Sequence, residues 1–310
     1  MNVRLTCLAG GVGAARFLQG LVRIVPPRNL TIVVNTGDDF QFCKLHVSPD
    51  LDIVMYTLAG IVDEAKGWGI RGDTFNTLEM LANYGCETWF RLGDKDFATS
   101  IYRTSLLAQG LTLSEVTDKL CRLLGLEVKI IPMTNQTVET KVQTAFGTIG
   151  FQEYLVKRKA EPRVLDVFLG GAEEAEPAPG ILEAIHDSDG VIICPSNPIV
   201  SIGTILTVRE VKEAISKTRA KVLSISPIVG GAPIKGPADK LMRAKGVEVS
   251  AYGVAELYKD FLDIFIVDNL DRDLKSQIEG LGVKVIISST IMKDLDDKVR
   301  LAELCLRAIG

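Results

Sequence analysis

A glycine-rich turn near the start of the chain has the residue types of a phosphate-binding loop. Gly10, Gly11, Val12 and Gly13 separate a short apolar run from an amphipathic stretch that contains Arg16. Between a strand and a helix, such a turn leaves backbone N–H groups free at the positive helix end, where an anion is stabilised. Arg16 would oppose the helix dipole unless an anion lay nearby. The turn predicts anion binding, although it lacks the G-K-[ST] ending of a P-loop and the third glycine of a dinucleotide motif.

Two adjacent carboxylates, Asp38 and Asp39, follow the next apolar run, shortly after Asn35. A dinucleotide site needs a single acidic residue at this place. Because Mg²⁺ binds one or two carboxylates and shares phosphate oxygens, the pair indicates a hard cation beside the phosphate. Asp50 lies at the start of a later helix, where it either caps that helix or faces the same cleft.

A third loop carries Ser196 and Asn197, and Ser201 and Gly203 open the helix after it. Hydroxyl and amide groups in this loop could bind a phosphate or the edge of a base. Ser201 alone would be explained as a helix cap, but turn chemistry leaves Ser196 and Asn197 without a role.

A fourth loop contains Ser226, Gly230, Gly231 and Lys235. The two glycines leave the backbone accessible, and the lysine supplies a positive charge. Loops of this length after a strand are more often functional than structural. In a doubly wound sheet, ligands bind beyond the carboxyl ends of the strands. The four loops therefore predict one common site.

A fifth segment places Trp89 beside Arg91 and Asp94. Neighbouring aromatic residues are more often part of a core than a ligand platform. Here the aromatic residues lie among charged ones, which leaves room for a planar ring as the partner.

Apolar runs rich in β-branched residues alternate with helical patterns, as in a parallel sheet with helices on both faces. They predict strands at 3–9, 30–34, 128–131, 164–168, 190–194, 221–225, 264–267 and 283–287. The predicted fold class is α/β, a Rossmann-like doubly wound, mostly parallel sheet with a helical insertion and a small antiparallel ribbon. The ribbon is expected from the stretches 138–142 and 151–156. We assign 1–61 and 161–310 to the Rossmann-like domain and 62–160 to the insertion.

Composition and charge exclude several classes of protein. The net charge of −4 argues against nucleic acid as a partner, because nucleic acid favours a basic face. Neither a signal peptide nor an apolar stretch that could span a bilayer is recognised, and the six cysteines are scattered. A cytoplasmic protein without membrane association is expected. The two histidines, His46 and His186, lie in no nucleophile–base pattern, so catalysis by a Ser-His-Asp or Cys-His group is not predicted.

Together and in this order, these segments resemble the 2-phospho-L-lactate transferase family of coenzyme F-420 biosynthesis, in its archaeal type. The resemblance covers nearly the whole chain and comprises the glycine turn, residues 35–39, 49–52, 56–58 and 89–96, Arg103-Thr104, and the loops at 196–203 and 226–231. Such a series is far more specific than any single motif. The chain departs from the family pattern at Cys43 and Ser100, where a histidine is expected.

The resemblance implies a Rossmann-like fold, a bound Mg²⁺ ion and a homodimer. The implied reaction moves 2-phospho-L-lactate from lactyl-2-diphospho-5′-guanosine to the ribityl hydroxyl of 7,8-didemethyl-8-hydroxy-5-deazariboflavin (Fo). The products would be coenzyme F-420-0 and GMP.

The resemblance also implies roles for individual residues. Asp38 and Asp50 would be the catalytic carboxylates, and the metal would be held by Asp38, Asp39 and Asp50. The donor and its phosphates would be bound by Gly10, Gly11, Val12, Gly13, Arg16, Ser196, Asn197, Ser201, Gly203, Ser226, Gly230, Gly231 and Lys235. The insertion would contribute to the acceptor site, formed by Asp50, Trp89, Arg91 and Asp94. Phosphoryl transfer needs such positioning and charge neutralisation more than covalent chemistry.

Two other functions remain open at this point. One is a nucleotide-sugar-binding regulatory protein of the same superfamily without transferase activity, against which the segment around Trp89 argues. The other is an NAD-dependent dehydrogenase, against which the missing third glycine and the doubled aspartate argue.

Overall fold

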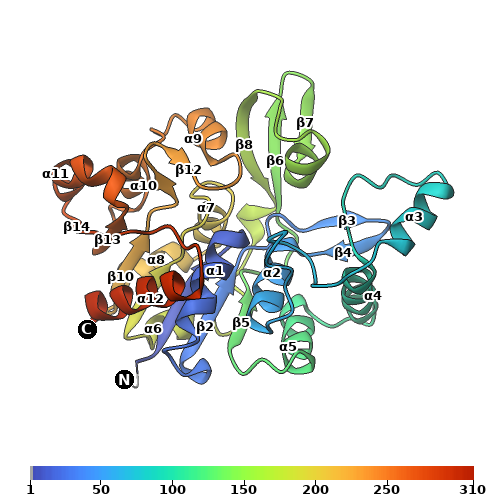
Figure 1. The fold of residues 1–310 in the computed structure, drawn as a ribbon, viewed down its shortest axis with the longest axis horizontal. Helices are drawn as coiled ribbons and strands as arrows, with labels where there is room; N and C mark the ends of the chain where they lie inside the picture. Colours follow the sequence, from blue (N-terminus) through green and yellow to red (C-terminus); the bar gives the residue numbers. More distant parts are fainter. Residues whose placement is uncertain (1–2) are drawn as a thin grey trace.

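The computed structural model describes residues 3–310, and its centre is a parallel seven-stranded sheet in the order β14-β13-β10-β9-β1-β2-β5 (Figure 1). The strands are β1 (Leu5–Ala9), β2 (Leu30–Val34), β5 (Lys129–Pro132), β9 (Gly190–Ile193), β10 (Lys221–Ile225), β13 (Ile264–Val267) and β14 (Lys284–Ile287). From β1 the chain first adds strands on one side and later on the other, which is double winding. The predicted fold class is confirmed.

Helices cover both faces of this sheet and enclose two hydrophobic cores. One face carries α1 (Gly11–Leu21), α2 (Pro49–Leu58), α5 (Leu113–Leu123) and α12 (Leu295–Ile309). The other carries α6 (Ile181–His186), α7 (Ile202–Thr207), α8 (Val211–Lys217), α9 (Ala238–Ala244), α10 (Ala251–Tyr258) and α11 (Lys275–Glu279). The inner strands are therefore buried on both sides, and this explains their continuous apolar sequences.

A second sheet, antiparallel and three-stranded, stands at the top of Figure 1. It contains β6 (Glu139–Thr144), β7 (Gly147–Gly150) and β8 (Val164–Gly170), in the order β7-β6-β8. The strand expected at 164–168 was assigned to the wrong sheet. In β8 only Val164 and Val167 are buried, so the strand is largely open to solvent, unlike the inner strands of the central sheet. The second half of the ribbon, expected at 151–156, is also wrong: β7 takes that place, and residues Glu153–Lys157 form a short π-helix, η2.

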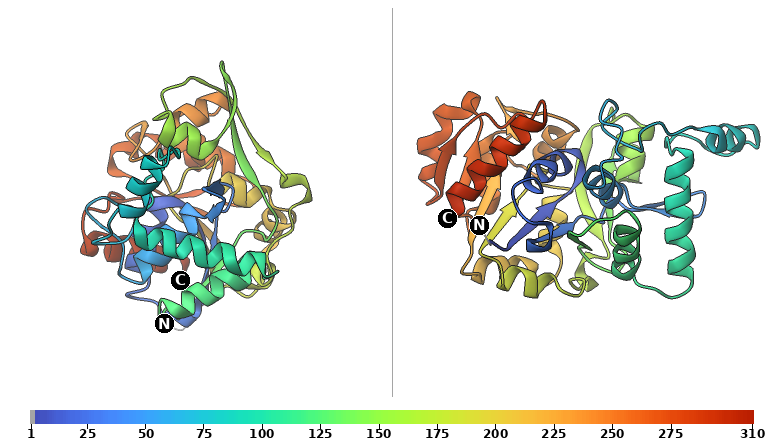
Figure 2. Two further views of the ribbon diagram at one scale, coloured as in Figure 1. Left: turned by 90° about the vertical axis from the view of Figure 1, so that its right-hand side faces the viewer. Right: turned by 60° about the horizontal axis from the view of Figure 1, so that its bottom comes forward.

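An arm projects from the sheet domain, to the right in Figure 1 and in the right-hand view of Figure 2. It consists of the hairpin β3 (Phe40–Phe42) and β4 (Leu45–Val47), with α3 (Asn76–Asn83) and α4 (Asp94–Ala108). A small core of its own, built on Phe42, Val47, Leu78, Leu92 and Phe97, holds it together. The hairpin joins β2 to α2 and so connects the arm directly to the predicted acidic site.

The remaining elements are short. They are the 3₁₀ helices η1 (Pro27–Asn29), η3 (Ala172–Glu174) and η4 (Asn269–Leu274), and the two-stranded ribbon of β11 (Ile228–Val229) and β12 (Ala232–Pro233). None of the helices formed by residues 3–310 is long and apolar enough to cross a membrane.

The domain division at residues 61 and 161 stays a prediction. The range 62–160 contains α3, α4, α5, β6 and β7, but also β5, which pairs with β2 as an edge strand of the central sheet. The segment is thus interwoven with the sheet domain, and the arm takes its hairpin from residues before 62.

Candidate active site

The glycine turn lies at the carboxyl end of β1, next to the loop that follows β9. The Gly10 N–H donates to Ser196 Oγ at 3.3 Å. A Cβ on Gly13 would lie 2.3 Å from the carbonyl oxygen of Pro195, so only glycine allows this approach. Because β1 and β9 are the neighbours at which the strand order reverses, the turn lies at the topological switch point, the usual ligand site of such sheets.

The end of β2 and the start of α2 meet at the same place. Asn35 Nδ2 donates to Asp50 Oδ2 at 2.9 Å, and Asn35 Oδ1 accepts from the Gly37 N–H at 2.9 Å. A Cβ on Gly10 would lie 2.8 Å from Asp50 Oδ2. Asp50 therefore faces the glycine turn. Of the two roles left open for Asp50, helix cap or part of the cleft, this position favours the second.

Burial and mutual repulsion shape the carboxylates. Burial raises the pKa of Asp38 well above its usual value, and the neighbouring charge of Asp50 raises it further. Burial also raises the pKa of Asp50 to about 7, against hydrogen bonds from Asn35 and the Gly11 backbone. Asp38 is only 6% exposed, and its Oδ1 has no hydrogen-bond partner among residues 3–310. Two crowded acids with an unpartnered oxygen fit a divalent cation that completes its shell with phosphate oxygens.

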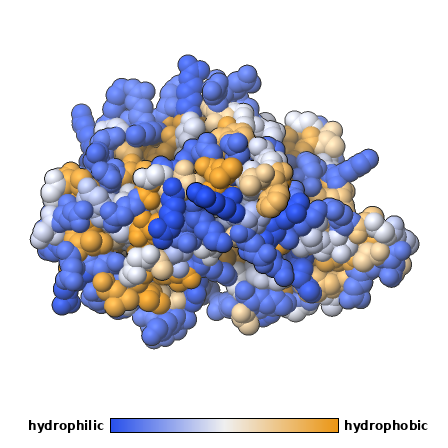
Figure 3. All heavy atoms as spheres, turned by 90° about the horizontal axis from the view of Figure 1, so that it is seen from above, coloured by the Kyte–Doolittle hydropathy of each residue, from blue (hydrophilic) through white to orange (hydrophobic). Residues whose placement is uncertain are grey.

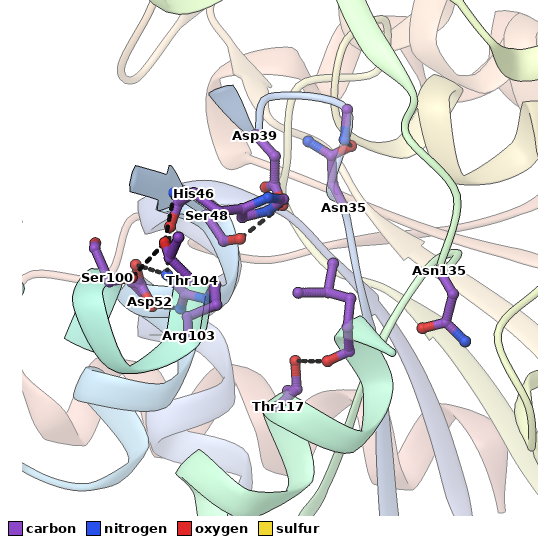
Figure 4. Close-up of polar contacts among 12 residues, drawn as sticks. Asn35, Asp39, His46, Ser48, Asp52, Ser100, Arg103, Thr104, Thr117 and Asn135 are labelled. Atoms are coloured by element: carbon purple, nitrogen blue, oxygen red, sulfur yellow. Dashed lines mark hydrogen bonds and ion pairs between the residues drawn. The ribbon is translucent and has the colours of Figure 1, made fainter. Parts of the chain in front are cut away.

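Asp39 is placed differently from Asp38. Its Oδ2 accepts from Ser48 Oγ at 2.6 Å and lies 2.8 Å from His46 Nε2 (Figure 4). Within the described part of the chain, no three acidic, histidine or cysteine side chains form a preformed metal site. The three-carboxylate metal site stays a prediction, and the residues that fit it best are Asp38 and Asp50.

The residues expected to bind the donor divide into two groups. Ser196 and Ser201 reach the glycine turn, since a Cβ on Gly10 would lie 2.6 Å from the Cβ of Ser201. Asn197 shapes its own loop, because Oδ1 accepts from the backbone N–H groups of Ile199 and Val200. The neighbouring Gly203 is likewise packed against the backbone of that loop.

The loop after β10 is bound by a carboxylate of the protein itself, the side chain of Asp271. The Gly230 N–H donates to both carboxylate oxygens of Asp271, at 3.0 and 3.1 Å, and Ser226 Oγ donates to the Ile228 carbonyl. A phosphate at Gly230 would have to replace Asp271. The roles predicted for Ser226, Gly230 and Gly231 stay predictions.

The two cations predicted for the donor lie away from the carboxylates. Arg16 donates from Nη2 to the Lys293 carbonyl at 3.2 Å, beside the start of α12. Lys235 extends its ammonium to the loop 62–72, where it lies 3.1 Å from the position of a Cβ on Gly67. Either would need to reorient to reach a phosphate at the glycine turn.

The predicted acceptor residues Trp89, Arg91 and Asp94 all belong to the arm. The Trp89 ring lies 5.7 Å from that of Phe40, and the Arg91 guanidinium lies 4.5 Å from the ring of Phe75. Asp94 accepts from Thr74 Oγ1 and from two backbone N–H groups at the start of α3, and these bonds lower its pKa. These contacts build the arm, and the acceptor role of the three residues stays a prediction.

Comparison with known proteins shows which family the chain belongs to. Residues 5–297 match the family described as 2-phospho-L-lactate transferase CofD. The chain belongs to this family. The 2-phospho-L-lactate transferase of Methanothermobacter thermautotrophicus is 43% identical over 98% of both chains, and that of Methanocaldococcus jannaschii is 44% identical over 99% and 98%. The phosphoenolpyruvate transferase of Streptomyces coelicolor is 45% identical over 98% of this chain and 97% of its own.

A solved structure with the same fold comes from a member of the UPF0052 family of Bacillus halodurans. It has a TM-score of 0.68 at 16% identity and covers 99% of both chains. At this identity the likeness concerns the fold alone.

The site of this CofD-family chain contains residues that sequence reasoning missed. His46 and Ser48 both contact Asp39, and Arg103 forms a buried ion pair with Asp52. His46 was not predicted as a site residue because the sequence around it has no nucleophile–base pattern. Asp52 and Arg103 lay within motifs of the family resemblance, but nothing in their spacing paired them.

The raised pKa values predict that this family member is more stable in mild acid. A carboxyl whose pKa rises from its ordinary value of 3.8 to about 7 on folding, as for Asp50, binds a proton that the unfolded chain releases. The free energy of unfolding should therefore increase as the pH falls from about 8 towards 5. Asp96, whose pKa burial also raises to about 7, should add to the effect. Thermal unfolding across this range checks it. A smaller slope is expected for D50N, and stability that falls on acidification would contradict the prediction.

Proposed function

We propose that the protein transfers 2-phospho-L-lactate from lactyl-2-diphospho-5′-guanosine to the ribityl hydroxyl of Fo, with coenzyme F-420-0 and GMP as products. One observation carries this proposal: the glycine turn, Asn35, Asp38 and Asp50 converge at the switch point of the sheet. Backbone N–H groups beside crowded carboxylates suit a diphosphate and a divalent cation. Figure 3 shows the molecule from above, with hydrophilic residues over much of this face and several hydrophobic patches among them.

In the proposed reaction the ribityl oxygen attacks the phosphorus next to lactate, and the bond to the GMP oxygen breaks. The hydroxyl proton passes to Asp50, which faces the glycine turn and acts as the general base. Asn35 and the Gly11 N–H hold this carboxylate in place. Mg²⁺, held by Asp38 with Asp50 or Asp39, would neutralise charge on the diphosphate oxygens.

The three-carbon acid on the donor is the finer part of the proposal. Relatives named 2-phospho-L-lactate transferase and phosphoenolpyruvate transferase have almost the same identity to this chain, 43–45%. A donor that carries phosphoenolpyruvate is therefore the second candidate. We further propose that the enzyme works in the cytoplasm, in keeping with its six free cysteines. We also propose that it forms a homodimer, as the family resemblance implies.

Turnover with purified protein tests the proposal. With Fo, Mg²⁺ and the lactyl donor, we expect one GMP for each deazaflavin product, and chelation of the metal should stop the reaction. The phosphoenolpyruvate donor is assayed in parallel and is expected to react more slowly. If neither donor reacts but a nucleotide sugar binds, the regulatory function replaces the proposed one.

A further inference from the structure

Arg103 is completely buried between the arm and the sheet domain. It lies on α4, has an exposure of 0%, and forms two hydrogen bonds with the carboxylate of Asp52 in the first turn of α2. Nη1 also donates to the carbonyl of His46 on β4 at 3.4 Å. One guanidinium thus joins three elements. A buried arginine is costly, because its charge and its donors must all be compensated.

The neighbouring residue strengthens the contact with β4. Thr104 Oγ1 accepts from the His46 N–H at 2.8 Å and donates to the Ser100 carbonyl at 2.7 Å. Both backbone groups of His46 are therefore held by α4. Figure 4 shows this group in one place, with Arg103, Thr104 and Asp52 on one side of His46 and Asp39 on the other.

The side chain of His46 extends the chain of contacts to the acidic loop. The Nε2 atom of His46 lies at hydrogen-bond distance, 2.8 Å, from Asp39 Oδ2. Ser48 Oγ donates to the same oxygen at 2.6 Å. Asp39 Oδ1 is left buried and without a partner within residues 3–310. Asp38 is the preceding residue in the sequence, so anchoring Asp39 restrains the backbone that carries Asp38.

The second connection runs through α2. Asp52 lies two residues after Asp50 in the first turn of α2, so the ion pair with Arg103 holds the backbone segment that carries Asp50. Burial raises the pKa of Asp52, and the charge of Arg103 opposes that rise. The two hydrogen bonds from Arg103 hold the Asp52 side chain at the first turn of α2, close to the carboxylates of the site.

We propose that Arg103 is a positioning residue for the carboxylates Asp38 and Asp50. It acts through Asp52 on one side and through His46 and Asp39 on the other. This inference rests on the proposed function, since it concerns the same site. A purely structural ion pair between arm and sheet domain is the alternative, and the two roles predict different kinetics.

The test compares R103M, which removes the charge, with R103K, which keeps it but loses the planar fork. R122M is the matched control, because Arg122 forms an exposed ion pair with Asp118 on α5. For R103M we expect kcat to fall on the order of 10²-fold with little change in KM for either substrate, since a small misplacement at the reacting centre has that effect. R103K should recover part of kcat, and R122M should behave as wild type.

A second readout needs no substrate. The chain has two histidines, and His186, with a side chain 88% exposed, is an internal reference. In nitrogen-15 NMR spectra, the ring-nitrogen signals of His46 should shift in R103M and move back towards wild type in R103K, while those of His186 stay unchanged. If R103M does not fold, R103K is used in its place. We then expect a smaller loss of kcat and a smaller shift of the His46 NMR signals than those expected for R103M.

The outcomes separate the two claims. A wild type without transferase turnover refutes the proposed function. An active wild type whose R103M variant keeps its kcat, or loses kcat only in proportion to its unfolded fraction, overturns the positioning role alone. Unchanged His46 signals in R103M also overturn it.

Discussion

Replacing Asp38 by asparagine should abolish turnover and leave the fold intact. Asp38 presents a buried oxygen, Oδ1, that has no hydrogen-bond partner within residues 3–310, and it lies beside Asp50. Asparagine keeps the shape and loses the charge that the cation and the diphosphate need. Removing a preorganised electrostatic partner of this kind lowers kcat by about 10²–10³-fold, and a lost metal ligand adds to that effect.

The same variant should unfold at a higher temperature than wild type at neutral pH. The charge of Asp38 is destabilising in the folded protein, because burial and Asp50 both raise its pKa. D63N is a suitable control, since Asp63 forms an ion pair with Lys66 outside the site and this partner lowers its pKa. Kinetic assays and thermal unfolding of both variants check the prediction. Turnover of D38N near that of wild type would remove Asp38 from the mechanism.

Most of the central sheet could be predicted because its strands are buried on both faces. Val33 and Ile192, for example, lie in continuous apolar runs, which are typical of strands covered on both faces. Residues 164–168 gave a similar signal but belong to the antiparallel sheet. An apolar run indicates a strand without indicating its partners, which depend on contacts distant in sequence. The hairpin of β3 and β4 was missed because its strands have only three residues each.

The site was predicted where its residues follow strands and was missed where they depend on pairing. Asp38 and the glycine turn end neighbouring strands, so topology alone brings them together. Arg103 and Asp52 lie on different helices, and no periodicity links them. Asp271 shows the converse: Gly230 had the expected pattern of an anion-binding loop, but the anion in place is a carboxylate of the protein itself.

Alanine at Gly10 should lower turnover strongly with a moderate loss of stability. The φ of Gly10 is −159°, an extended conformation that any residue adopts, so the effect comes from space alone. The added Cβ would lie 2.6 Å from the Cβ of Ser201 and 2.8 Å from Asp50 Oδ2. Overpacking of this kind costs about 1–3 kcal/mol. Because the atom displaced is the proposed general base, we expect kcat to fall on the order of 10²-fold.

A second substitution separates the two contacts of that new methyl group. In the G10A/S201G double variant, glycine at 201 removes the nearest atom, so the melting temperature should return most of the way to that of S201G alone. Asp50 would still be displaced, and kcat should stay far below that of S201G. G170A is the matched control, since the nearest atom to a Cβ there is 3.7 Å away, at the Glu139 carbonyl. If the double variant regains turnover together with stability, the displacement of Asp50 does not limit the reaction, and Gly10 serves only close packing.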